Sequence, residues 1–191
     1  MGRVVSFEDR AVARLRDRLG VSEDARADLL AFAQSHSDAV ASIHQAVLAA
    51  LDARDLDGLL GTVTHDWPAF LGVDTSVLAI VVGDKAFRAD TRGVTQLSRP
   101  IVDRMLGDLP NVVMRGANRG HALFGDEAEF IGAEALVRIA APIPEVYGLL
   151  ALGQFEKSDI KGGHGSSLLL FLGSALGAMM HGWLSEGTIQ G

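Results

Sequence analysis

The sequence predicts an α+β domain with a central antiparallel sheet flanked by helices and preceded by a long N-terminal helix. Three observations support this fold class. Apolar residues step by three and four over much of the first quarter of the chain, which is the period of an α-helix. Further on, two pairs of apolar runs are each joined by a short turn, which is typical of β-hairpins. A final stretch, Ser166–Leu184, holds no Asp, Glu, Lys or Arg and closes the domain as a helix.

Composition narrows the function before any motif is considered. The chain has 191 residues and a net charge of −7, which argues against nucleic acid as a partner because phosphate binding needs a basic surface. It has no Cys, which excludes disulfides, thiolate nucleophiles and Cys-ligated metals. The first residues, MGRVVSFEDR, lack the apolar core of a secretion signal, so we expect a cytoplasmic protein.

The N-terminal region is predicted to be helical and to have a partner. Ser6 caps a short helix that ends at Gly20, and Ser22 caps a second helix that reaches Ala53. The second helix carries an apolar seam, formed by Leu29, Phe32, Ala33, His36, Val40, Ile43, Val47 and Leu51. Such a seam either packs on its own domain or joins two chains, and its length favours a homodimer.

The next elements follow from turn and cap residues. Asp55 caps a helix that Pro68 should end or kink near Asp66, and Gly72 marks its exit. The elements expected after it are a strand at Val73–Val82, a Gly83-Asp84 turn, a return strand at Lys85–Ala89, a loop at Asp90–Gln96, a helix at Ser98–Leu106, a strand at Asn111–Met114, a basic loop at Arg115–His121, a helical turn within Leu123–Phe130, strands at Ala135–Ala141 and Val146–Gly153, and a polar loop at Glu156–Gly165.

The charge-free stretch Ser166–Leu184 can be a membrane span or a doubly buried helix. Its length is near the ~20 residues that cross a bilayer, but it has no aromatic belt at both ends. It follows a hairpin directly, and we interpret it as a buried helix and expect no membrane partner. Its bulky face should pack on the sheet, and the opposite face of small residues should admit another helix. That small face consists of Gly173, Ser174, Gly177 and His181.

Several stretches resemble a bacterial family known as domain of unknown function 484. The N-terminal part is VSFEDRAVARLRDRL (Val5–Leu19) followed by ARDLDGLL (Ala53–Leu60). The C-terminal part is GAEALVRIAAPI (Gly132–Ile143) followed by YGLLALGQFEKSDIKGGHGSSLLLFLG (Tyr147–Gly173). The resemblance implies a GAF-like fold, and we expect a helical segment at 1–53 and a GAF-like domain at 54–187.

No catalytic constellation appears in the sequence. The six His residues form no metal pattern, and there is no HExxH or G-x-S-x-G motif. GAF-like methionine sulfoxide reductases and thioether-linked bilin sensors need the cysteines that this chain lacks. We therefore expect neither an enzyme nor a protein with a metal or cofactor.

The candidate ligand site is a group of basic residues. The resemblance to GAF domains places Arg88, Arg115, Arg119 and His121 near the rim of a pocket, and Arg138 lies between apolar residues of a strand. An Arg in an apolar strand needs a partner, which is either a carboxylate or a bound anion. The alternative is that these residues are solvated surface charges with one structural salt bridge.

Two hypotheses for the function remain open. The first is a non-enzymatic GAF-like sensor or regulatory domain that dimerises through its terminal helices. Its ligand is not identified by the sequence, and the basic residues favour a small anion. The second is a helix-mediated interaction module with a vestigial pocket and no small-molecule ligand. The positions expected to pack helices together are Leu29, Phe32, His36, Val40, Ile43, Val47, Gly173, Gly177 and His181.

Overall fold

The computed structural model describes residues 7–141, 146–157 and 165–187, and at 7–22, 25, 29, 32 and 183–187 it describes the backbone only. The seam side chains of Leu29 and Phe32 therefore lie outside the description, as does most of the expected polar loop before the last helix. The chain forms two compact units, Met1–Asp38 and Ala39–Gly191. The boundary lies earlier than the expected residue 53, because the end of the first helix belongs to the second unit.

The first helix is continuous. Helix α1 spans Phe7–Leu51, so the expected break at Gly20 is wrong. A glycine inside a helix costs only about 1 kcal/mol relative to alanine, and no proline follows it here to stop the helix. Ile43, Ala46 and Ala50, near the end of α1, are buried in the core of the second unit.

A helical segment with a π turn in its middle leads from α1 to the sheet. Its parts are α2 (Leu56–Gly61), the π-helical turn η1 (Thr62–Asp66) and α3 (Trp67–Leu71). The Asp55 carboxylate caps α2 by accepting from the Gly58 N–H at 2.8 Å. Pro68 has no N–H to continue the helix, and the Trp67 N–H bonds to the Thr62 carbonyl five residues back. The helix was expected to end or kink near Asp66, but the backbone stays helical there and the change is the π turn η1; the exit at Gly72, which is left-handed with φ 66°, is confirmed.

The second unit is built on one antiparallel sheet of six strands in the order β3-β2-β1-β6-β5-β4. Both predicted hairpins are present, but β3 lies where a loop was expected. All its residues except the last have exposed side chains at the sheet edge, so burial imposes no apolar alternation on its sequence. The strands are β1 (Thr75–Val82), β2 (Lys85–Asp90), β3 (Gly93–Leu97), β4 (Val112–Gly116), β5 (Ala133–Ala140) and β6 (Val146–Gln154).

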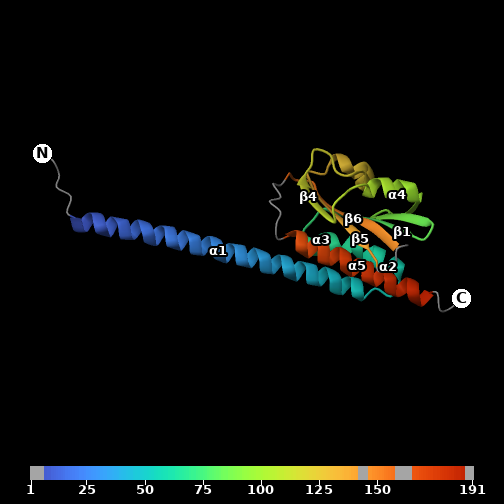
Figure 1. Cartoon of the computed structure of the whole chain (residues 1–191), viewed down its shortest axis with the longest axis horizontal. Helices are drawn as coiled ribbons and strands as arrows, with labels where there is room; N and C mark the ends of the chain where they lie inside the picture. The colour runs from blue at the N-terminus through green and yellow to red at the C-terminus, as the bar shows by residue number, and fades with distance from the viewer. Residues whose placement is uncertain (1–6, 142–145, 158–164, 188–191) are drawn as a thin grey trace. The chain divides into compact units, whose positions relative to one another are not determined.

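Each face of the sheet is covered by its own set of helices. Figure 1 shows α2, α3 and α5 (Gly165–Gly187) on one side and α4 (Arg99–Leu106) on the other. We call the first side the helix face; its core includes the buried Trp67, Leu150 and Leu172. We call the second the α4 face; there α4 and the 3₁₀ segment η2 (Ala122–Glu129), with its buried Phe124, cover strand residues such as Leu149. Alternate residues of the strands therefore serve two separate cores.

The small face of α5 packs on the sheet, which corrects the expectation that it meets another helix. A Cβ at Gly173 would lie 2.7 Å from Val137 Cγ1, and one at Gly177 would lie 2.4 Å from the Ala140 carbonyl oxygen. Both glycines therefore allow the helix backbone to approach β5. Ser174 is exposed and His181 is half-buried on the remaining surface.

The lack of charged residues in Ser166–Leu184 is explained in part by packing on the sheet. Among the described residues, Gly165–Gly182 is a helix long and apolar enough to cross a membrane by length and composition alone. Its apolar side chains Leu169, Leu172, Leu176 and Met180 are buried in the core of the helix face. One side of the segment therefore packs in the domain core, but Leu170 and Phe171 are exposed, so the expected burial on both sides is not found.

The glycine contact can be tested by adding one methyl group. We expect Gly177→Ala to lower the free energy of unfolding by about 1–3 kcal/mol, because the methyl group overlaps the Ala140 carbonyl. The matched control is Gly182→Ala on the same helix, where a Cβ meets no atom within 4 Å. That substitution should raise the free energy of unfolding by about 0.5–1 kcal/mol through helix propensity. Urea unfolding followed by circular dichroism measures both, and equal effects would contradict the close contact.

Candidate functional site

The five basic residues predicted as ligand contacts do not form one cluster. Arg88 lies on β2, Arg115 on β4, and Arg138 on β5, while Arg119 and His121 lie in the segment that follows β4. The structure brings only Arg115 and His121 together, through a shared carboxylate. Arg119 is a surface residue, 4.0 Å from Glu129, with both side chains more than two-thirds exposed.

Arg138 has a structural partner that was not anticipated. Its Nη1 donates to the carbonyl oxygens of Leu106, Gly107 and Leu109 at 3.4, 3.2 and 2.9 Å. Leu106 is the last residue of α4, where free carbonyls and the helix dipole favour a cation. The expected carboxylate or anion is therefore replaced, at this nitrogen, by a helix C-terminus.

Arg115 and His121 share the buried carboxylate of Glu134. Glu134 Oε1 accepts from Arg115 Nε at 2.7 Å, and Oε2 accepts from the His121 backbone N–H at 2.6 Å. The Glu134 side chain is fully buried, whereas that of Arg115 is half exposed. A buried charge needs this pairing and hydrogen bonding, so the three residues tie the strand pair to the loop.

The His121 ring is held in its neutral form. Nδ1 accepts from the Leu123 backbone N–H at 3.2 Å, so the proton is assigned to Nε2, which donates to the Met105 carbonyl oxygen at 3.2 Å. Burial lowers the pKa of His121 below its ordinary value, against the opposing charge of Glu134. Protonation would put two donors face to face at Nδ1.

Arg88 belongs to a second charge network on the α4 face. It pairs with Asp90, and its Nε donates to the Leu123 carbonyl oxygen at 2.8 Å. Arg92 bridges Asp90 and the exposed Asp126. Burial alone would raise the pKa of Asp90, but hydrogen bonds from the Arg92 backbone and the Arg88 guanidinium outweigh it and hold that pKa below the ordinary value. This network ties β2 to η2.

We consider two cavities among the described residues of the second unit, and the five basic residues do not line either of them together. One cavity, of about 360 Å³, lies at the end of β5 and includes Arg138, Asn111 and Tyr147 in its lining. Burial and a hydrogen bond to Asp103 raise the pKa of the Tyr147 hydroxyl. The other cavity lies on the helix face, on the opposite side of the sheet from the arginine contacts.

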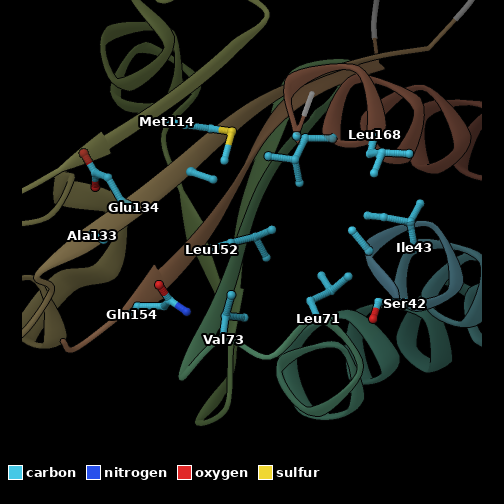
Figure 2. Close-up of a pocket in the computed structure, with 14 residues that line it drawn as sticks. Ser42, Ile43, Leu71, Val73, Met114, Ala133, Glu134, Leu152, Gln154 and Leu168 are labelled. Carbon is cyan, nitrogen blue, oxygen red and sulfur yellow. The ribbon is translucent and has the colours of Figure 1, made fainter. Parts of the chain in front are cut away.

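The helix-face cavity has a volume of about 300 Å³ and is lined mainly by aliphatic side chains. Figure 2 shows Met114, Leu152, Val73, Leu71, Ile43 and Leu168 around it, with Ser42 and Gln154 on opposite sides. None of these residues was predicted as a ligand contact, although Ile43 was expected to pack helices. The signal that could have found the cavity is the pair Ala133 and Ala135, two small residues on the same face of β5.

We looked for side chains that could bind a metal ion in the described part of the chain. Among those residues there is no group of three or more His, Asp or Glu side chains placed to hold a metal ion.

Comparisons with known proteins concern the family and the fold. The model of a family described as "Protein of unknown function, DUF484" matches residues 1–185. A search of curated proteins finds no match.

Similar solved structures include several GAF domains. One, from a putative sensor histidine kinase of Pseudomonas syringae pv. tomato, is 12% identical, with a TM-score of 0.54, 85% of this chain covered and 98% of that one. Another, from a Coxiella burnetii phosphoenolpyruvate-protein phosphotransferase, is 13% identical, with a TM-score of 0.55 and coverages of 80% and 98%. The corresponding Acinetobacter domain is 13% identical, with a TM-score of 0.51 and coverages of 77% and 95%. At these identities the likeness shows the fold, which is GAF-like as predicted.

The buried carboxylate provides a stability test. We expect Arg115→Ala to lower the free energy of unfolding by about 3 kcal/mol, because it leaves Glu134 buried with only the His121 N–H as a described partner. Arg119→Ala is the matched control in the same region and should change it by less than about 0.5 kcal/mol, since its ion pair is exposed. Denaturant unfolding measures both, and a small loss at Arg115 would contradict the pairing.

The His121 ring predicts a pH dependence. Its pKa is lower in the folded chain than the ~6.5 of the unfolded chain, so its contribution to stability is fully present above that value. The contribution is lost as the pH falls from there through the folded-state pKa. Unfolding free energies measured from about pH 7 to pH 5 should therefore fall more steeply for the wild type than for His121→Gln. Asn118→Gln, at an exposed position in the same segment with a side chain that does not titrate, should keep the wild-type slope.

Proposed function

We propose that this chain, which belongs to the DUF484 family, is a non-catalytic regulatory domain of the GAF type that works as a homodimer joined through α1 and α5. The observation that carries the proposal is the exposed apolar surface of these two helices. Leu48 and Leu51 on α1 are 62% and 58% exposed, and Leu170 and Phe171 on α5 are 44% and 49% exposed.

The first unit supports the same proposal independently. Every described side chain from Glu23 to Ala39 is exposed, and Leu30 is 55% exposed. A single helix with so little burial is marginal in water, and most helices owe their stability to packing of an apolar face. A second copy of α1 would provide such a face, because in a symmetric dimer the apolar seam of one chain packs against the same seam of the other.

Part of the apolar seam predicted from the sequence packs on the second unit, and part of it stays exposed. Ile43 is buried in the core of its own unit, and Val47 is partly buried against that core. Val40 is half-buried and His36 is exposed. The proposed dimer contacts therefore use the apolar residues that the domain does not bury itself.

The second candidate function is an interaction module without a small-molecule ligand. It is favoured by the packing of the α4 face, where Leu123 and Phe124 are fully buried, and by the internal contacts of Arg88, Arg115 and Arg138. An anionic ligand would have to compete with these contacts, except at the buried Arg88 Nη2, which has no described hydrogen-bond partner. A cytoplasmic location, and the lack of a nucleic-acid or membrane partner, stay predictions from composition.

Light scattering tests the dimer. At micromolar concentration we expect twice the chain mass for the wild type and a monomer for the double variant Leu48→Asp/Phe171→Asp, because charges would be buried at the interface. The matched control is Ile101→Asp on α4, which replaces another exposed apolar residue and should remain dimeric. A wild-type monomer, or a dimer that survives the double variant, would contradict the proposal.

A further inference from the structure

We propose that the helix-face cavity is a binding site for a small, uncharged and largely apolar molecule of about two fused rings. This inference deepens the proposed function by giving the regulatory domain its input. The regulatory effect of binding rests on the proposed function. Binding itself does not, because it can be measured whether or not the chain dimerises.

The lining of the cavity sets the chemical class. It is dominated by the aliphatic side chains of Ile43, Leu71, Val73, Leu152 and Leu168. Ligand sites of this kind combine an apolar wall with a few polar groups that orient the ligand. Here the polar side chains that face the space are Ser42 and Gln154, and the Gln154 amide donates to the Gly72 carbonyl oxygen at 3.2 Å.

The charges of the described lining argue against an ion. Among the residues that the structure describes, this lining includes one charged residue, Glu134, whose carboxylate points away from the space in Figure 2 and is held by Arg115 and the His121 N–H. An anion bound against these residues would therefore gain no cationic partner. A cation would likewise find a carboxylate that is already paired.

The size of the cavity sets the size of the ligand. Its volume is about 300 Å³. An apolar cavity of about 150 Å³ in another protein stays dry and binds benzene. A space about twice as large suits two fused rings, and Met114, with its flexible thioether, gives one wall the freedom to adjust.

The position of the cavity links a ligand to the helices. Ala39, Ser42 and Ile43 come from α1, while Gly165, Leu168 and Leu169 come from α5. The opposite wall is the sheet, through Ala133 and Ala135 of β5. A bound molecule would touch both helices proposed to join the dimer, so its binding would change how firmly they pack on the sheet.

Methyl NMR of the full chain tests the site, with indole and naphthol as uncharged probes and an indolecarboxylate as the charged analogue. Two reporters, Ile43 and Met114, line the helix-face cavity. Ile139 lines the second cavity, and Ile131 lies in the core of the α4 face. We expect saturable shifts at Ile43 and Met114 with an uncharged probe, and at least about tenfold weaker binding of the charged analogue.

Variants that fill the space provide the control. Ala135→Leu places a larger side chain in the cavity from β5 and should weaken binding at least about tenfold. Ala39→Phe does so from the exposed surface of α1, which keeps the test sound if the core variant folds poorly. Ala140→Leu, on the same strand but in the lining of the second cavity, should bind like the wild type.

The outcomes separate this inference from the dimer. Four results would each overturn the site. They are shifts centred on Ile131 or Ile139, binding that survives both filling variants, a preference for the charged analogue, and the failure of both uncharged probes to bind saturably. Light scattering of the same samples reports the dimer independently. Binding to a monomer would support the site while contradicting the proposed assembly.

Discussion

The close contact between α5 and β5 is the constraint on which the helix face depends. Gly173 and Gly177 let the helix backbone approach Val137 and Ala140, so α5 is fixed against the middle and the end of the strand. At the beginning of both elements, Ala133 and Ala135 are too small to fill the space before Gly165 and Leu168. Tight packing at one end of the contact and small side chains at the other thus produce both the core and the cavity.

Much of the fold could be predicted because its signals are local. The two hairpins, the helix cap at Asp55 and the exit at Gly72 each follow from the properties of a few neighbouring residues. The edge strand β3 could not, since its exposed side chains lack the alternation that burial imposes. The small face of α5 was assigned to the wrong neighbour because composition shows that a close approach occurs, without showing which element approaches.

The candidate site was harder to predict for a different reason. An arginine in a strand signals that a partner exists, but spacing along the chain does not distinguish a carboxylate from the carbonyls at a helix end. In the structure Arg138 donates to carbonyl oxygens at the C-terminus of α4, and Arg115 pairs with Glu134, nineteen residues away in sequence. The helix-face cavity was missed because it results from missing side-chain volume, whereas sequence motifs report the chemical groups that are present.

The exposed edge strand β3 also bears on how the protein behaves at high concentration. As the last strand of the sheet, β3 presents an edge whose backbone groups have no further strand to pair with, and its sequence GVTQL carries no charge. The adjacent Arg92 is paired with Asp90 and Asp126, so a group of charged side chains lies beside that edge. Charged residues next to an edge strand disfavour its pairing with another chain, and here the same carboxylates also join η2 to β2.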